Sequence, residues 1–237
     1  MTRFGPTFLY MRHWPQPGLL PRSAARGETF RTVAYFGNEK NLADDLRSPQ
    51  WERELDRRGL AWISRYQPFD YADPATYAPA SVWSDYRGID AVVALRRSPH
   101  GVESMHGQKP ASKLYNAWIA GVPAILGRES AYRVERRSEL DYLEANSGDE
   151  VLACLDRLRA SPELRHAMAE NAHGRAAEVC AGATLEAWVA LLFGRVLPAY
   201  RAWTHAGTLA RHWALSRQQV GYQTTRVRQA VERRLGR

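Results

Sequence analysis

Cysteine is scarce in this chain of 237 residues, which contains only Cys154 and Cys180. Both stand in helix-like segments, and neither belongs to a CxxC pair or to a Cys/His spacing typical of a metal site. A disulfide-rich scaffold and a zinc-finger protein are therefore excluded, and no metal site is expected. We expect both cysteines to be reduced core residues of a cytoplasmic protein, with a disulfide between them as an open but unsupported alternative.

Long apolar runs are also missing. The run Phe8–Met11 is too short for the core of a signal peptide, and residues 187–193 are too few to span a bilayer. The chain is therefore expected to be soluble. Its 45% of hydrophobic residues is enough to bury a sizeable core.

Acidic residues are nearly absent from the C-terminal end. From Pro198 onward there are eight arginines and one glutamate, so this segment carries most of the net charge of +8. A nucleic-acid enzyme usually spreads its positive charge over the whole body, so nucleic acid is not the expected partner. For residues 201–237 the sequence leaves three readings open: a solvated helix, a segment that contacts anionic lipid, and a disordered tail.

The most informative stretch is Lys109–Glu129. Pro110 and Ser112 predict a helix start with Ser112 as its cap, Gly121 predicts the helix end, and residues 122–126 predict a buried strand. Two lysines, Lys109 and Lys113, flank the helix start, where free amides and the helix dipole favour an anion. This pattern predicts a phosphate-binding corner of an α/β sheet; an ordinary unit whose lysines face solvent is an equally open reading.

Apolar patterns before and after this stretch predict the other strands and helices of the sheet. Strands are predicted at 32–36, 61–66, 91–95, 122–126 and 140–144, and helices at 41–58 with a break at 48–49, at 112–120, at 130–137, from 147, from 161 and at 185–200. The predicted fold is an α/β, Rossmann-like parallel sheet with flanking helices, followed by C-terminal helices. Its expected parts are an extended lead-in (1–30), the sheet domain (31–200) and a basic tail (201–237).

Glycine and basic residues follow two of these strands. Gly37 and Lys40 come after the first, and Arg96 and Arg97 after the third. Because ligands bind at the carboxyl ends of strands in open α/β sheets, these residues are expected at the same edge as Lys113. A plain turn at Gly37 and solvated arginines are the alternatives.

The order of these motifs resembles the C-terminal, nucleotide-sugar-binding half of GT-B-type glycosyltransferases over residues 30–200. The resemblance is most specific in Ala117–Ile125, which reads as helix, Gly-x-Pro and strand, and in the helix that begins at Ser161. It implies that the chain is a single GT-B half in which Glu129 binds a sugar or ribose hydroxyl. The implied donor- and phosphate-binding residues are Gly37, Lys40, Arg96, Arg97, Lys109, Lys113, Asn116 and Glu129.

The sequence departs from this family in two ways. Retaining members carry two glutamates where Gln108 and Asn116 stand here, so the resemblance does not choose between retention and inversion. The family's N-terminal acceptor domain has no counterpart before residue 30. We expect that a second chain supplies that domain, that the sequence is a reduced or truncated form, or that the activity has been lost.

The expected function is the transfer of a sugar from a nucleotide-sugar donor to a glycan or envelope acceptor, without a metal or a bound cofactor. No Ser-His-Asp order or paired acids compete for the site; His100 and His106 are the candidate bases, with a surface role as the alternative. The alternative function is a non-catalytic module that binds a nucleotide or nucleotide sugar. A basic tail on anionic lipid would make the cytoplasmic protein peripheral at the inner membrane face.

Overall fold

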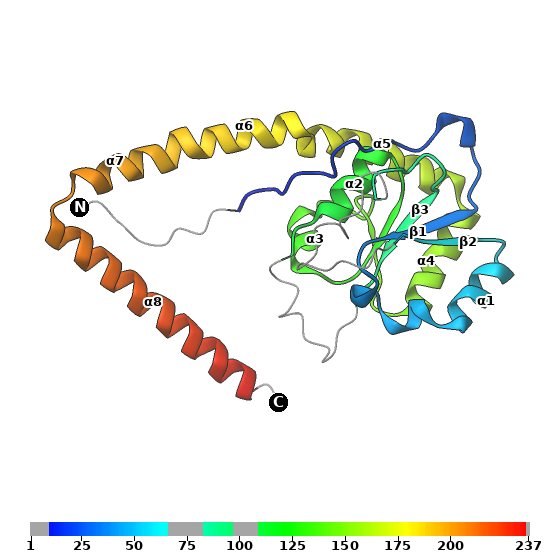
Figure 1. Cartoon of the computed structure of the whole chain (residues 1–237). Coiled ribbons are helices and arrows are strands. Elements are labelled where there is room, and N and C mark those ends of the chain that lie inside the picture. Colours follow the sequence, from blue (N-terminus) through cyan, green and yellow to red (C-terminus); the bar gives the residue numbers. More distant parts are fainter. Residues whose placement is uncertain (1–9, 66–82, 97–108, 236–237) are drawn as a thin grey trace, which may run out of the picture. The chain divides into compact units, whose positions relative to one another are not determined.

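The computed structural model describes residues 10–65, 83–96 and 109–235. In these residues five short strands form one parallel sheet in the order β2-β1-β3-β4-β5. Figure 1 labels β1, β2 and β3 of this sheet. The strands are β1 (Thr32–Phe36), β2 (Ala61–Arg65), β3 (Ala91–Ala94), β4 (Ala124–Leu126) and β5 (Leu143–Glu144). The predicted α/β, Rossmann-like parallel sheet with flanking helices and C-terminal helices is confirmed.

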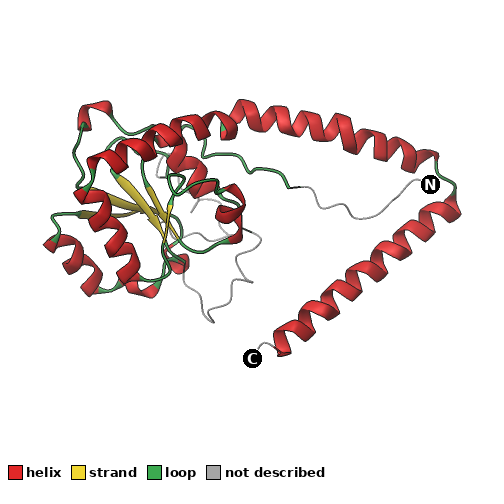
Figure 2. Ribbon diagram, turned by 180° about the vertical axis from the view of Figure 1, so that it is seen from behind, coloured by secondary structure: helices red, strands yellow, loops and turns green. Residues whose placement is uncertain are grey.

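The helices are α1 (Pro49–Arg57), α2 (Ser112–Ala120), α3 (Ser130–Glu135), α4 (Gly148–Ala160), α5 (Pro162–Val179), α6 (Ala181–Leu191), a π-helix (Leu192–Val196), α7 (Leu197–His205) and α8 (Thr208–Leu235). Among the described residues, α1 lies between β1 and β2, α2 between β3 and β4, and α3 between β4 and β5, and further helices follow β5. Single 3₁₀ turns are formed by Ala24–Arg26, Glu39–Asn41 and Asp44–Arg47. Figure 2 shows the sheet enclosed by helices on both faces.

Alternate side chains of β1 point to opposite faces of the sheet, and each face has its own core. Phe36 belongs to the cluster that contains Trp118 of α2. Tyr35 belongs to the other cluster, with Leu55 of α1 and Leu155 of α4. Burial on both faces explains why the strands read as nearly continuous apolar runs in the sequence.

Several helix ends are set by the capping residues that the sequence provides. Ser147 and Ser161 cap α4 and α5 by accepting hydrogen bonds from the backbone amides of Glu150 and Leu164. Gly121 ends α2 in the left-handed conformation, with φ of 67°. The predicted cap at Ser112 is wrong, because α2 begins at Ser112 itself and Ala111 occupies the cap position without a side-chain hydrogen bond.

Three further sequence expectations need correction. The helix predicted over 41–58 is two 3₁₀ turns followed by α1, and the last strand begins at Leu143 rather than at 140. Both cysteines are free, but only Cys154 packs against a core cluster, whereas Cys180 is exposed. Cys180 is the residue between α5 and α6 and has an extended backbone, which explains why its thiol is not enclosed.

The contacts divide the chain into two units. The sheet unit is Arg12–Thr184, and the helical unit contains the helices from Leu185 onward. This division differs from the expected boundaries at residues 30 and 200. Residues 12–30 belong with the sheet because they bond to it; the amide of Leu20 donates to the Ser84 carbonyl at 2.8 Å, and that of Arg22 to the Ala120 carbonyl at 3.0 Å.

Candidate functional site

The strand order marks one position at the edge of the sheet. β1 and β3 are neighbours, yet the chain continues from β1 to β2 on the far side of β1. The chain therefore crosses from β1 and from β3 to strands on opposite sides, although Leu42 after β1 still pairs with Arg96 after β3 and the amide of Ala43 donates to the Leu95 carbonyl at 2.9 Å. In open parallel sheets ligands bind outside the carboxyl ends of the strands at such a switch point. The ends of β1 and β3 are thus the first place to look for a site.

Lys113, the second residue of α2, brings an amine to the end of β1. Its Nζ donates a hydrogen bond to the carbonyl oxygen of Phe36 and lies 4.9 Å from the centre of the Tyr35 ring. The ring face attracts a cation and the carbonyl oxygen accepts a hydrogen bond, so the two contacts fix the position of the amine. The start of α2 is thereby joined to the last residues of β1.

Gly37 is required by this arrangement. A Cβ atom at Gly37 would lie 2.5 Å from Lys113 Nζ and 2.8 Å from the hydroxyl oxygen of Tyr35, closer than such atoms approach in proteins. The sequence pattern predicts that Gly37 makes room for a ligand. In the structure the space beside Gly37 is filled by Lys113 and Tyr35.

Arg96 and Glu129 form an ion pair at the ends of β3 and β4. Arg96 Nε donates to Glu129 Oε1 at 2.7 Å, and the two side chains are 12% and 3% exposed. Glu129 lies at the start of α3, which fixes its backbone. Its second carboxylate oxygen, Oε2, is buried and has no hydrogen-bond partner among the described residues. A buried acceptor without a partner is costly, so this oxygen is a candidate contact for a ligand hydroxyl.

Burial and neighbouring charges set the protonation of this group. Burial, together with the positive charge of Arg96, lowers the pKa of Lys113 to about 7, and Glu129 only partly opposes this. Burial raises the pKa of Tyr35 to about 12 and raises the pKa of Tyr132, which also lies near Glu129. Near neutral pH the Lys113 amine is therefore partly uncharged, and a bound anion would favour its protonated form.

The structure therefore brings together four residues that the sequence predicts for the donor site: Gly37, Arg96, Lys113 and Glu129. Lys40 and Lys109 are exposed, and within the described residues neither side chain makes a hydrogen bond or ion pair; the backbone amide of Lys40 donates to Asn38 Oδ1 at 2.9 Å. Asn116 of α2 is buried, and its Oδ1 accepts a hydrogen bond from the backbone amide of Gln16, in the N-terminal segment, at 2.9 Å. Arg97, His100 and His106 lie outside the described residues.

Sequence reasoning missed Tyr35 and Tyr132. The signal for Tyr35 was the period of two along β1, which places it one residue before the end of the strand and on the face opposite Phe36. Tyr132 gives no such signal, because its position follows from the packing of α3. Both hydroxyls border the charged group formed by Lys113, Arg96 and Glu129.

Within the described part of the chain, no three His, Cys, Asp or Glu side chains gather in a way that could hold a metal ion. Comparison with protein-family models, with curated proteins and with solved structures gives no match.

Proposed function

We propose that this chain binds the diphosphate of a nucleotide sugar at the ends of β1 and β3 and transfers the sugar to a glycan or envelope acceptor. The observation that carries the proposal is the convergence of Lys113 and Arg96, from different elements, on the topological switch point of a parallel sheet. A phosphate there would meet one lysine, one arginine and the free amides of the first turn of α2.

The reaction requires little more than these contacts. The oxygen of an acceptor hydroxyl attacks the anomeric carbon, the bond from that carbon to the phosphate oxygen breaks, and the nucleoside diphosphate leaves with the bonding electrons. Positive charge on Lys113 and Arg96 stabilises the negative charge that develops on the leaving group. The hydroxyl proton passes to a base, for which His100 and His106 remain the candidates. A second chain that supplies the acceptor domain is part of this proposal.

Glu129 offers the proposed ligand a second contact, in addition to the phosphate contacts of Lys113 and Arg96. Its buried Oε2 can accept a hydrogen bond from a sugar or ribose hydroxyl, while Oε1 holds Arg96 in place. The same carboxylate partly neutralises Arg96, so it weakens the attraction of the site for a bare anion. Glu129 would therefore favour a ligand that carries both a hydroxyl and a phosphate.

The direct test measures binding of nucleoside diphosphates by titration calorimetry and their release from a panel of nucleotide sugars, with and without a candidate acceptor-domain chain. Lys113→Ala should weaken diphosphate binding by about 1–3 kcal/mol, because it removes a charge-assisted contact. Lys109→Ala is the matched control, since Lys109 is exposed just before the same helix. Equal effects of the two substitutions, or no diphosphate binding by the unaltered protein, would refute the site.

Glu129→Gln separates phosphate binding from sugar binding. The substitution keeps the shape of the side chain and frees Arg96, so affinity for inorganic pyrophosphate should rise by about 1 kcal/mol. Affinity for a nucleotide sugar should fall by about 1.5–3 kcal/mol, because a hydrogen bond to a charged acceptor is lost. If both affinities change in the same direction, the assigned role of Glu129 is wrong.

A non-catalytic module that holds a nucleotide or nucleotide sugar is the second candidate function. It is favoured by one observation: Arg96 is already paired with Glu129, so part of the positive charge is neutralised before any ligand binds. This candidate predicts diphosphate binding and the Lys113 effect without turnover. Release of nucleoside diphosphate, measured in the presence of the acceptor chain, decides between the two functions.

A further inference from the structure

The helical unit exposes large apolar side chains along its first half. Leu185, Val189, Leu192, Val196 and Tyr200 follow one another at intervals of three or four residues, and all are exposed. Residues at this spacing lie on one face of a helix. The run passes through α6, the π-helix and α7, so it forms an apolar face several turns long.

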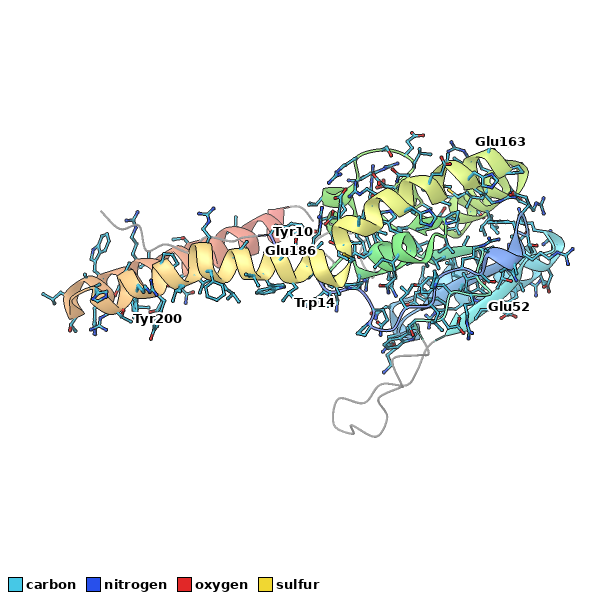
Figure 3. The ribbon with its side chains drawn as sticks, turned by 90° about the horizontal axis from the view of Figure 1, so that it is seen from above. Tyr10, Trp14, Glu52, Glu163, Glu186 and Tyr200 are labelled. Carbon is cyan, nitrogen blue, oxygen red and sulfur yellow. The ribbon has the colours of Figure 1, made fainter. Side chains whose placement is uncertain are left out.

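The apolar character is not confined to that face. Phe193 lies beside the run and is 65% exposed, and between Leu185 and Tyr200 only Glu186 and Arg195 carry a charge. Figure 3 shows side chains standing off both sides of the helix between Glu186 and Tyr200. The stretch Pro162–His205 is long and apolar enough to cross a membrane by length and composition, with a mean hydropathy of 1.5 and 11% burial in its most apolar part. A helix that is apolar nearly all round requires an apolar environment.

The second half of the helical unit is basic. The first turn of α8 contains Leu209, which is 87% exposed, and the helix also contains Arg211 and Arg217. The Arg217 guanidinium lies 5.3 Å from the centre of the Trp213 ring. Tryptophan beside arginine is typical of the membrane–water interface, where the ring is amphipathic and the cation reaches phosphate. From Pro198 onward the chain has a surplus of seven positive charges.

We infer that the helical unit binds the surface of an anionic phospholipid bilayer. The helix from Leu185 to Tyr200 is buried among the upper acyl chains, and the arginines of α8 contact the lipid phosphates. This inference is independent of the proposed transferase function. Its observations come from the helical unit alone.

The geometry favours a helix that lies in the interface over one that crosses the bilayer. The most apolar part of the helix is eighteen residues long, about 27 Å, whereas the hydrocarbon core is about 30 Å thick. Glu186 and Arg195 would also have to enter that core. A second copy of the chain is a poorer occupant, because coiled-coil pairing uses a single apolar stripe and two α8 helices would bring their arginines together.

The test is co-sedimentation of the full-length protein with vesicles of phosphatidylcholine alone and of phosphatidylcholine with phosphatidylglycerol. The protein should bind the anionic vesicles and be released by an alkaline carbonate wash. Equal binding to both vesicles would overturn the role of the arginines. Resistance to carbonate would show a spanning helix. If the protein binds neither kind of vesicle and forms dimers in sedimentation equilibrium, the lipid assignment is overturned.

Matched variants assign the contact to residues. Phe193→Glu should reduce binding to the anionic vesicles by about tenfold, whereas Val134→Glu, at a residue of α3 that is also 65% exposed, should leave it unchanged. The double variant R211Q/R217Q should lose about 10–30-fold, and R31Q/R53Q, at exposed arginines of the sheet unit, should not. If the two members of either pair behave alike, the helical unit does not make the contact.

Discussion

The sheet unit and the helical unit differ in how far they bury side chains of the same kind. Leu155 of α4 is fully buried, whereas Leu192 of the π-helix is 45% exposed. Charged residues differ as well; Asp90 before β3 is enclosed by donors, whereas Arg211 and Arg217 of α8 form no ion pair among the described residues. The sheet unit thus has a buried core in which a few polar atoms such as Glu129 Oε2 lack a partner, whereas the helical unit leaves many of its large apolar side chains exposed.

Asp90 is a buried charge of the sheet unit that is surrounded by hydrogen-bond donors. Its carboxylate accepts hydrogen bonds from Arg22, Arg26 and the backbone amides of Arg31 and Thr32. Burial alone would raise the pKa of Asp90, but these donors outweigh it and lower the pKa. One carboxylate therefore ties the N-terminal segment to the first and third strands.

The largest effect is expected from Asp90→Asn. The amide has no charge and only one acceptor oxygen, so buried donors lose their partner and the free energy of unfolding should fall by about 3–5 kcal/mol. Urea denaturation at neutral pH measures it. Since the carboxylate contributes stability above its unfolded pKa of about 3.9 and loses it as pH falls through the lower folded pKa, the difference between the proteins should shrink in acid.

Asp44→Asn is the control for this substitution. Asp44 is exposed and forms a surface ion pair with Arg47, three residues away. Its substitution should cost less than about 1 kcal/mol. Similar losses for Asp44→Asn and Asp90→Asn would mean that the buried carboxylate is not a stabilising centre.

The comparison of the two units is tested most directly by one pair of leucines. Leu155→Ala leaves a cavity in the core and should destabilise the protein by about 2–5 kcal/mol. Leu192→Ala removes a side chain that is 45% exposed in the free protein and should cost less than about 0.5 kcal/mol. Urea denaturation of both variants gives the two values. A large loss for Leu192→Ala would show that its side chain is covered in solution.

Gly37→Ala should act on the site rather than on the fold. The new Cβ would displace the Lys113 amine or the Tyr35 hydroxyl, so diphosphate affinity should fall by about 1–3 kcal/mol. Gly194→Ala is the control in the helical unit, because a Cβ there meets no atom within 4 Å. Calorimetric titration with a nucleoside diphosphate measures both. Unchanged binding by Gly37→Ala would place the anion elsewhere.

The smallest effect is a pH dependence of binding. Lys113 has a pKa of about 7 in the free protein, and a bound phosphate raises it, so binding takes up a proton above neutral pH. Diphosphate affinity should therefore fall by about tenfold or less between about pH 7.5 and about pH 9.5, and Lys113→Arg should flatten this dependence. Titration in buffers with different ionisation heats counts the protons. A flat profile for the unaltered protein would exclude Lys113 from the contact.

Much of the sheet could be predicted because its signals are local. The residues of β1, the glycine that ends α2 and the serines that cap α4 and α5 act within a few positions of themselves. The predictions that failed, the capping role of Ser112 and the strand start at residue 140, depend on where neighbouring elements allow a helix or strand to begin. Charge and hydropathy likewise identified the basic C-terminal end, but not the exposure of the apolar helix before it.

The candidate site was predictable in part for the same reason. Strand ends and a helix start place Arg96 and Lys113 at one edge, which a sequence pattern can show. It cannot show that Arg96 is paired with Glu129, 33 residues away, or that Asn116 is held by Gln16, 100 residues away. Those pairings depend on which elements meet in space.

The order of residues alone determined a parallel sheet with its glycine turns and serine caps, since backbone conformation and burial of alternating side chains act over short distances. Tertiary structure decided the rest. Only packing places the Lys113 amine against the carbonyl of Phe36, lowers its pKa by burial, and leaves one oxygen of Glu129 without a partner. Burial and electrostatic interaction depend on distance in space, and distance along the chain does not determine them.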